Sequence, residues 1–369
     1  MIIGVPKEIK NHEYRVGLTP KSVKFLINEK HDVFIENNAG IGSGFSNDDY
    51  SRVGGKILHT AKDLFDRSDL IIKVKEPQLE EINLMKEDQI IFTYLHLASS
   101  QNLTNQLIKK KCIAFAYETI SDDLVGLPLL KPMSEVAGRL SIQAGARCLE
   151  KTLGGRGILL GGSSYSKPAK TLVIGGGVVG YNASLIALGM GSDVTIIEKS
   201  LSKINFLKKE FPKAIVLNLN DIKVLDYLSE SDLVIGAVLI PGALAPKVIN
   251  KKDLNFMKSG SVIVDVAIDQ GGCFETSRAT THQDPTYIIN DVIHYCVANM
   301  PGAVPRTSTI SLNTATIGYI SELAKLGAEN FCKIDHHHLN GLNVYKGHLT
   351  YRPVAENFKM QYTDLNSII

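Results

Sequence analysis

The segment TLVIGGGVVGYNASLIALGMGSDVTIIEKS, residues 171–200, decides the fold. Gly175, Gly177 and Gly180 form a GxGxxG pattern directly after a β-branched run, and a helical stretch, Val178–Leu188, begins within the pattern. The first glycine permits a tight turn, the second lets the backbone approach a pyrophosphate, and the third lets helix and strand pack closely. The helix N-terminus favours phosphate charge. The segment therefore predicts a strand–loop–helix unit that binds a dinucleotide.

An acidic residue ends the next predicted strand. Glu198 follows Gly180 by 18 residues, where a carboxylate can bind the hydroxyls of the adenosine ribose. The same carboxylate would repel a 2′-phosphate, whereas nearby Lys203 would attract one. The pattern therefore predicts NAD in preference to NADP. The alternative is a glycine turn that serves packing only.

Strand and helix patterns alternate along most of the chain. This alternation is typical of parallel α/β sheets, and the nearly continuous apolar character of the strands indicates helices on both faces. The predicted strands form two series, Ile2–Val5, Val33–Glu36, Leu70–Val74, Ile90–Leu95 and Ile113–Glu118, then Thr171–Ile174, Val194–Glu198, Ala214–Leu217, Leu233–Val238 and Ser261–Val266. The sequence therefore predicts an α/β protein with two Rossmann-like, doubly wound domains.

Two further stretches define the organisation of the chain. A helix opened by Ser134 and running to Leu149 is predicted to connect the two series. The tail after Pro305 has another helical stretch, Asn313–Lys325, and then a polar segment with no strong strand. Because this tail is too short for a core of its own, we expect it to pack on an earlier part of the chain.

Composition excludes several classes of protein. The 40 basic and 38 acidic residues give a net charge of +2, so no global field would draw the chain to nucleic acid or an anionic membrane. The 5 cysteines are odd in number and too widely spaced for a CxxC site or a disulfide framework. The amino terminus has no signal-peptide pattern. We expect a cytoplasmic protein with neither nucleic acid nor membrane as a partner.

Further motifs run in order over essentially the whole chain. They are GVPKEIKNHEYRVGLTP, VKEP, TYLHLA, PMSEVAGR, GGRGILLGG, GGGVVG, GAVLIPG, VDVAIDQGGCFE and YCVANMPGAVPRTST. Through them the sequence resembles the L-alanine dehydrogenase family. The resemblance implies reversible oxidative deamination of L-alanine to pyruvate and ammonia with NAD. It also implies a homohexamer whose discontinuous substrate domain, residues 1–128 and 306–369, is interrupted by an NAD-binding domain, residues 129–305.

Proton transfer in such a reaction calls for a group that titrates near neutral pH, and histidine is the natural choice. His96 follows the apolar run IIFTYL, at the carboxyl end of a strand, where α/β sheets place their ligands. From the residues alone it could be a satisfied core histidine, but the resemblance implies that it is the acid/base residue. The run His336–His338 could suggest a metal site. No supporting ligand pattern accompanies it, so we expect a solvated loop and no metal.

The resemblance also assigns three residues around the substrate. Arg15 lies in a polar loop where a guanidinium could clamp a carboxylate, although such an arginine is ordinarily a solvated surface charge. Lys75 would hold the carboxylate or the developing carbonyl oxygen, its alternative being an ion pair with adjacent Glu76. Asp269 would hold the amine or the attacking water, although Asp before Gly-Gly is often only a turn. Asp265, inside an apolar strand, is predicted to be structural.

Further cofactor contacts follow from the resemblance. In addition to the glycine loop, they are Ser134 near the pyrophosphate, Val178, Glu198 at the ribose, Lys203 and Asn220 around the adenine side, and Leu239, Ile268, Asp269, Asn299 and Met300 at the nicotinamide half. The sequence departs from the family pattern at Glu198, commonly Asp, at Asn220, often Ser, and in the SSYSKP loop after Gly162. We expect little functional effect from that loop.

Two other classes of function remain open at this stage. One is the soluble nucleotide-binding subunit of a proton-translocating transhydrogenase, which shares the opening motif and the two-domain plan but does not retain the histidine of TYLHLA. The other is a protein that senses NAD without turnover. Such a sensor would not need Arg15, Lys75, His96 and Asp269 together.

Overall fold

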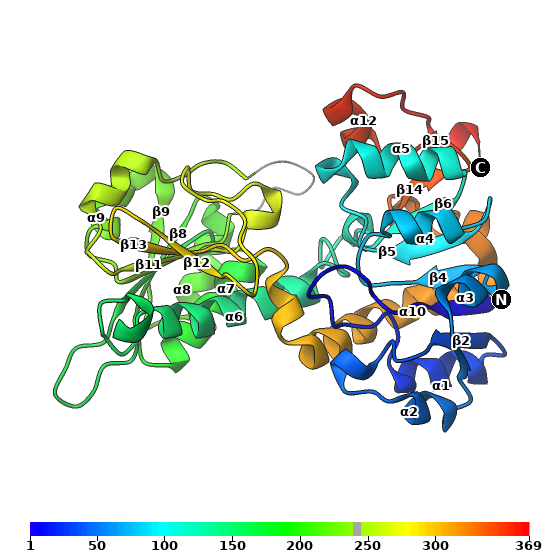
Figure 1. Cartoon of the computed structure of the whole chain (residues 1–369). Helices are drawn as coiled ribbons and strands as arrows, with labels where there is room; N and C mark the ends of the chain where they lie inside the picture. Colours follow the sequence, from blue (N-terminus) through cyan, green and yellow to red (C-terminus); the bar gives the residue numbers. More distant parts are fainter. Residues whose placement is uncertain (239–244, 369) are drawn as a thin grey trace. The chain divides into compact units, whose positions relative to one another are not determined.

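The computed structural model describes residues 1–238 and 245–368, which form two α/β units. Unit 1 consists of Met1–Met133 and Val304–Ile369, and unit 2 of Ser134–Ala303, so unit 2 is inserted in the sequence of unit 1 (Figure 1). The boundaries predicted from the sequence were at residues 128 and 305. Within residues 1–238 and 245–368, no helix has the length and apolar character needed to span a membrane.

Unit 1 contains an eight-stranded sheet of order β15-β14-β6-β5-β4-β1-β2-β3. Its strands are β1 (Ile2–Val5), β2 (Asp32–Glu36), β3 (Lys56–Leu58), β4 (Leu70–Ile72), β5 (Ile90–Thr93), β6 (Ile113–Ala116), β14 (Leu342–Tyr345) and β15 (His348–Leu349). Strands β1 to β6 are parallel, and β14 is antiparallel to β6. In chain order the parallel strands run 3-2-1-4-5-6, the doubly wound arrangement of dinucleotide-binding folds.

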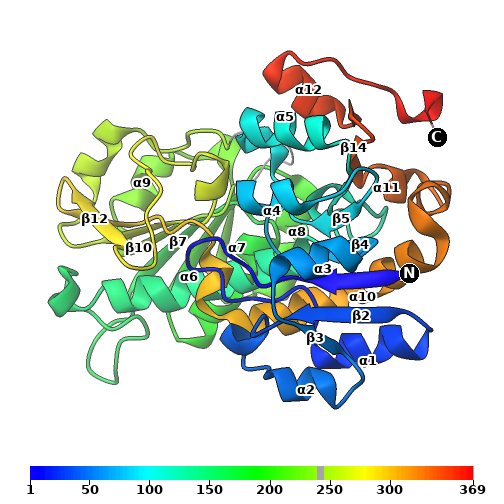
Figure 2. The same cartoon turned by 45° about the vertical axis from the view of Figure 1, so that its right-hand side comes forward.

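Helices cover both faces of this sheet. They are α1 (Pro20–Asn28), α2 (Asn47–Ser51), α3 (Ala61–Arg67), α4 (Leu79–Leu84), α5 (Gln101–Lys110), α10 (Pro305–Cys332), α11 (His336–Leu339) and α12 (Arg352–Phe358). On one face Ile71 and Ile91 share a core with α3, α4, α5 and α12. On the other face Phe92 and Phe115 meet Phe331 of α10 edge to face. Helix α10 also packs beside α1 (Figure 2).

The carboxyl-terminal tail completes unit 1, as expected, but two details of the prediction were wrong. The segment thought to lack a strand contains β14, whose four residues are all buried beside β6. This strand was missed because it is short and includes a polar residue, Asn343, whose side chain donates to Thr119 Oγ1 at 2.9 Å. The run His336–His338 is not a loop but lies in α11, because the Asp335 side chain caps the backbone N–H of His338.

Unit 2 contains a seven-stranded sheet of order β12-β13-β11-β10-β7-β8-β9. Its strands are β7 (Lys170–Ile174), β8 (Asp193–Glu198), β9 (Ile215–Asn218), β10 (Leu233–Gly236), β11 (Val262–Asp265), β12 (Thr286–Ile289) and β13 (Val292–Tyr295). All neighbouring pairs are parallel except β12 with β13. Strands β7 to β11 and β13 again run 3-2-1-4-5-6, so both units confirm the predicted doubly wound fold.

The helices of unit 2 position the glycine loop. They are α7 (Val178–Gly189), α8 (Leu201–Glu210), α9 (Val224–Leu228) and α6 (Lys131–Cys148), whose first residues belong to unit 1. Helix α6 begins before the predicted Ser134, because Pro132 fits the first turn of a helix. Gly138 of α6 lies so close to α7 that an added Cβ would be 2.3 Å from the carbonyl oxygen of Val179.

Candidate active site

Three of the predicted site residues follow neighbouring strands of unit 1. The strand order of its sheet changes direction between β1 and β4, and α/β sheets bind their ligands at the carboxyl ends of the strands at such a point. The chain carries Arg15 after β1, Lys75 after β4 and His96 after β5. Topology alone therefore brings these residues to one edge of the sheet.

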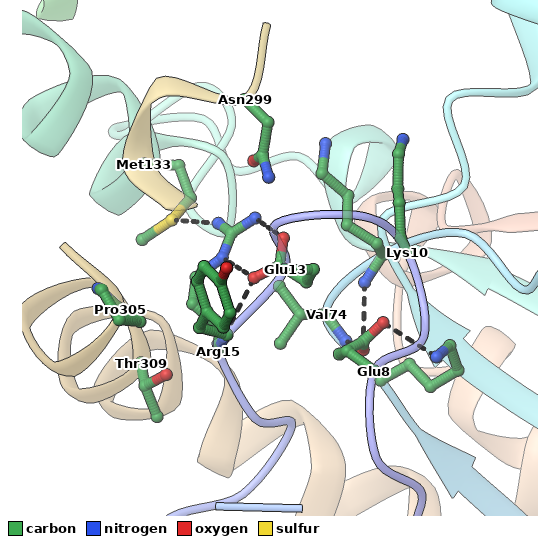
Figure 3. Close-up of polar contacts among 12 residues, drawn as sticks. Glu8, Lys10, Glu13, Arg15, Val74, Met133, Asn299, Pro305 and Thr309 are labelled. Atoms are coloured by element: carbon green, nitrogen blue, oxygen red, sulfur yellow. Dashed lines mark hydrogen bonds and ion pairs between the residues drawn. The ribbon is translucent and has the colours of Figure 1, made fainter. Parts of the chain in front are cut away.

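The Arg15 guanidinium is buried, with 2% of the residue exposed. Its Nε and Nη2 donate to the two carboxylate oxygens of Glu13 at 2.7 and 2.5 Å, and Nη1 contacts Met133 Sδ at 3.1 Å (Figure 3). Burial opposes the charge, but the Glu13 carboxylate outweighs it and raises the pKa of Arg15. The alternative of a solvated surface arginine is therefore excluded. Arg15 is a permanently charged, oriented group in the interior of unit 1.

Helix α10 fixes the loop that contains Arg15. The backbone N–H of Val16 donates to Thr309 Oγ1 at 3.3 Å, and that of Thr19 donates to Asn313 Oδ1 at 2.6 Å. The side-chain amide of Asn313 also donates to the carbonyl of Gly17 at 2.9 Å. Because both loop and helix groups are buried, these bonds replace hydration that the loop has lost. The tail of the chain thus holds the Arg15 loop in one conformation.

Lys75 is positioned by the Glu8 carboxylate, which accepts hydrogen bonds from the backbone just after β4. Glu8 Oε1 accepts the backbone N–H of Val74 at 2.7 Å and that of Lys75 at 3.3 Å, while Glu8 Oε2 accepts the buried Lys73 ammonium at 2.8 Å (Figure 3). The Lys75 side chain is buried, and its Nζ lies 3.4 Å from His96 Nε2. An ammonium can only donate, so Nε2 is the acceptor in this contact.

The ion-pair alternative for Lys75 involved Glu76. In the structure Glu76 forms an ion pair with Lys10 instead. Lys75 is therefore directed at His96 rather than at its sequence neighbour.

His96 occupies a turn of unusual backbone conformation. Its φ is 48°, in the left-handed region, and its backbone N–H donates to the Glu118 carboxylate at 2.6 Å. The imidazole stacks on Tyr94, with 5.7 Å between the ring centroids. Burial, and then the charge of Lys75, lower the pKa of His96 well below its ordinary value. The lowered pKa favours the neutral imidazole, whose Nε2 lone pair accepts from the Lys75 ammonium.

The glycine loop of unit 2 has the shape that a pyrophosphate requires. Gly175 has a φ of 102°, and an added Cβ would be 2.7 Å from the carbonyl oxygen of Ala237 after β10. A Cβ on Gly180 would be 1.8 Å from the oxygen of Gly175, whereas a Cβ on Gly177 would have no atom within 4 Å. The first and third glycines are thus required by the backbone. The second faces open space at the N-terminus of α7, where the backbone is accessible to a phosphate.

Glu198, at the end of β8, supports this loop. Its Oε2 accepts the backbone N–H of Gly176 at 2.7 Å, and its Oε1 accepts those of Lys199 and Ser200 at 2.8 and 2.9 Å. Burial disfavours the charged form, but the amides outweigh burial and lower the pKa of Glu198. A carboxylate has about four lone-pair sites, so this one can still accept a hydroxyl. The residues present therefore fit a dinucleotide whose ribose carries free hydroxyls.

The other predicted cofactor residues lie in varied environments in unit 2. Ile268 and Met300 are buried, Ser134 and Asn299 are partly buried, and Val178, Lys203, Asn220 and Asp269 are exposed. The Asp269 carboxylate accepts the backbone N–H of Asn299 at 3.3 Å. Leu239 lies outside the described residues. Asp265 is buried, and its carboxylate accepts the backbone N–H of Cys273 at 2.8 Å and the Ser277 hydroxyl at 2.5 Å, which are the contacts of a structural residue.

Besides Glu8 and Thr309, which accept from the backbone of Lys75 and Val16, four residues that orient the predicted groups were missed in the sequence. They are Glu13, Met133, Glu118 and Asn313. Only Glu13 offered a local signal, because it is an acid two residues before a basic side chain. The other three approach from distant parts of the chain, so no spacing rule could have identified them.

Unit 2 has a loop suited to a dinucleotide, and unit 1 presents a guanidinium, an ammonium and an imidazole. These features are those of a dehydrogenase of the α/β class. Two family models match the chain: Alanine dehydrogenase/PNT, N-terminal domain, over residues 4–137, and Alanine dehydrogenase/PNT, C-terminal domain, over residues 141–352. The chain therefore belongs to the alanine dehydrogenase/PNT family. This family acts on small molecules with a nicotinamide cofactor.

Individual relatives agree with this assignment. An alanine dehydrogenase of Halomonas elongata is 50% identical over 370 residues, covering 100% of both chains. A solved L-alanine dehydrogenase structure is 47% identical, with a TM-score of 0.93 over 97% of this chain and 99% of that one. A transhydrogenase from Sinorhizobium meliloti has a TM-score of 0.80 over 95% of this chain and 99% of that one, but only 21% identity. At that identity, the similarity to the transhydrogenase shows a shared fold and not a shared function.

Proposed function

We propose that this chain is an NAD-dependent alanine dehydrogenase that converts L-alanine reversibly to pyruvate and ammonia. The observation that carries this proposal is the contact between the neutral His96 imidazole and the Lys75 ammonium, on the same sheet edge as Arg15. It is supported by relatives about 50% identical over their full length that bear this name.

Arg15 and Lys75 would bind the substrate. A guanidinium already oriented by Glu13 loses little further conformational freedom when it binds a carboxylate, and it remains charged at every accessible pH. Lys75 Nζ would donate to the carboxylate or to the oxygen that becomes the pyruvate carbonyl. Because this ammonium is buried and adjoins His96, it would stabilise negative charge on that oxygen more strongly than a solvated lysine.

His96 would move the protons. Its neutral Nε2 would take a proton from the substrate amine and later activate water against the imine carbon. The proton taken from the amine would leave to solvent before His96 acts on water, so that one proton is released per turnover. The imidazolium formed when water is activated would then donate its proton to the departing amine nitrogen, which leaves as ammonia. Burial, with the charge of Lys75, lowers the pKa of His96 and so favours the neutral form that deamination needs.

NAD would bind to unit 2 and, when bound, accept the hydride from the substrate carbon. The Gly175, Gly177 and Gly180 loop with the start of α7 would hold the pyrophosphate, together with Ser134. The ionised Glu198 would accept the ribose hydroxyls and disfavour the 2′-phosphate of NADP. Lys203, Asn220 and the residues Ile268, Asn299 and Met300 would complete the adenine and nicotinamide sides, and Asp269 would orient the amine or the water. We propose that unit 1 serves as the substrate domain and unit 2 as the NAD domain.

The family resemblance implies the assembly, whereas the cysteines indicate the location. We propose a homohexamer, which light scattering after size-exclusion chromatography would measure. The cytoplasmic location is supported by five cysteines that are all free thiols.

A comparison of substrates tests the proposed reaction. L-alanine with NAD, and pyruvate with ammonia and NADH, should both turn over. D-alanine and L-lactate should give far lower kcat/KM values, because the first misplaces the amine relative to Arg15 and the second lacks it. Arg15→Lys should raise the KM for pyruvate at least about tenfold, roughly 1.4 kcal/mol, with the NADH affinity unchanged. Equal use of L-lactate and L-alanine would refute the proposal.

A further inference from the structure

Two histidines and an aspartate gather on the surface of unit 1, and the proposed reaction uses none of them. His336 and His337 come from α11, and Asp123 comes from the turn that follows β6. Each side chain offers one ligand atom, and these atoms all lie within 4.8 Å of one another. The histidine run was visible in the sequence, but its carboxylate partner Asp123 was not, because it comes from a distant part of the chain.

The separation of two of these groups matches a metal site. His337 Nε2 lies 3.4 Å from Asp123 Oδ2. In a tetrahedral site with bonds of about 2.0–2.1 Å, two ligand atoms are about 3.3–3.4 Å apart. The pair therefore needs little movement to hold one ion.

A second hydrogen bond orients the His337 ring. Its Nδ1 lies 2.8 Å from Ser121 Oγ, which also accepts the side-chain amide of Asn340 at 3.2 Å. A hydroxyl that accepts from Asn340 can accept the Nδ1–H as well, and in that tautomer the Nε2 lone pair is available to an ion placed between it and Asp123. Metal-binding histidines typically have their second nitrogen bonded in this way.

The neighbouring histidines have different roles. The His336 ring lies against that of His337, with 3.8 Å between their centroids, which brings a second imidazole to the same place. His338 instead bonds to Asp335 at 2.7 Å, and its Nε2 lies 3.4 Å from Glu322. Of the three histidines in the run, His336 and His337 therefore belong to the cluster with Asp123.

We propose that Asp123, His336 and His337 bind a divalent transition metal ion, with Zn²⁺ as the first candidate and solvent completing the coordination. Two imidazoles and one carboxylate suit Zn²⁺, Co²⁺ or Ni²⁺ rather than Mg²⁺ or Ca²⁺, which prefer oxygen ligands. The ion would join α11 to the turn at residues 121–126. This site is independent of the proposed reaction.

The alternatives are a simple ion pair between His337 and Asp123, and nonspecific chelation by three successive histidines. An ion pair alone would bind no Zn²⁺. Chelation by the run would depend on His338 as much as on His337, and it would not depend on Asp123.

The test is calorimetric titration of the untagged, EDTA-treated full-length protein with ZnCl₂. We expect one saturable site per chain, and at least about a tenfold weaker Kd for both Asp123→Asn and His337→Gln. The matched control His338→Gln should bind within about threefold of wild type. Ser121→Ala should weaken binding about 10–100-fold, because it frees the second nitrogen of a ligand.

Two further measurements keep the result independent of folding. Zn²⁺ should raise the Tm of wild type and of His338→Gln but not of Asp123→Asn, and Mg²⁺ should raise none of them. Co²⁺ should give the intense visible bands of a tetrahedral site. The proposal is overturned if no saturable binding occurs up to about 100 µM Zn²⁺. It is also overturned if Asp123→Asn binds as wild type does, or if His338→Gln is weakened as much as His337→Gln.

Discussion

Replacing His96 with asparagine should separate proton transfer from cofactor binding. Because His96 has a φ of 48°, the replacement must tolerate the left-handed region, which asparagine enters more readily than most residues. The backbone N–H to Glu118 is also retained. The variant therefore keeps the turn and loses only the imidazole, which makes it a cleaner probe than alanine.

The expected loss of turnover is that of a positioned acid/base group. Burial and the charge of Lys75 lower the pKa of His96, which favours the neutral form that accepts the proton. A positioned acid/base group contributes about 10²–10⁴-fold to turnover, roughly 2.7–5.5 kcal/mol. We expect His96→Asn to reduce kcat by that factor. His96→Ala should do the same, with an additional loss of stability at the turn.

Cofactor affinity provides the second half of the test. The glycine loop and Glu198 belong to unit 2, so the Kd for NADH should stay within about threefold of wild type. The fluorescence of bound NADH can be followed directly, because the chain has no tryptophan. His59→Asn, at an exposed histidine of unit 1, is the control for the substitution itself. Turnover of His96→Asn within about a factor of five of wild type would make His96 structural. Proton transfer would then have to be reassigned to Asp269 or Lys75.

Three other outcomes are expected. NAD should exceed NADP in kcat/KM by at least about tenfold, roughly 1.4 kcal/mol, because the ionised Glu198 repels a 2′-phosphate; equal use of both would contradict this and implicate Lys203. A fragment of residues 1–305 should fail to fold unit 1, since it lacks β14 and the Asn313 side chain that binds the Arg15 loop; a soluble, cooperative fragment with native-like activity would refute the account. Lys75→Gln should raise the pKa of His96 by removing a positive neighbour, so the acid limb of the residual deamination kcat/KM profile should move to higher pH. An unmoved limb would show that Lys75 does not govern this titration.

The glycine loop was predictable from sequence because its constraints are local. A Cβ at Gly180 meets the oxygen of Gly175 within the same loop, so no distant part of the chain can change the requirement. The repeated strand patterns likewise gave the doubly wound fold. Local patterns were sufficient for the architecture.

The positions at which β4, β5 and β6 end, just before the site residues, could not be predicted from local patterns. Predicted strands ran on to Val74, Leu95 and Glu118, whereas β4, β5 and β6 end at Ile72, Thr93 and Ala116. The backbone N–H groups of Val74 and Leu95 donate to the carboxylates of Glu8 and Glu118 instead of to a neighbouring strand. The apolar pattern continues through these turns, so only the tertiary contacts reveal where each strand stops.

The central claim is that this chain oxidises L-alanine, and the most direct measurement is the absorbance of NADH when purified full-length protein is mixed with NAD and L-alanine. The account predicts a steady rise in absorbance that depends on both compounds, with one pyruvate formed per NADH. It also predicts that NADH is consumed when pyruvate and ammonium are supplied instead. Binding of NADH without turnover in either direction would contradict the account and leave a protein that binds the nucleotide without catalysis.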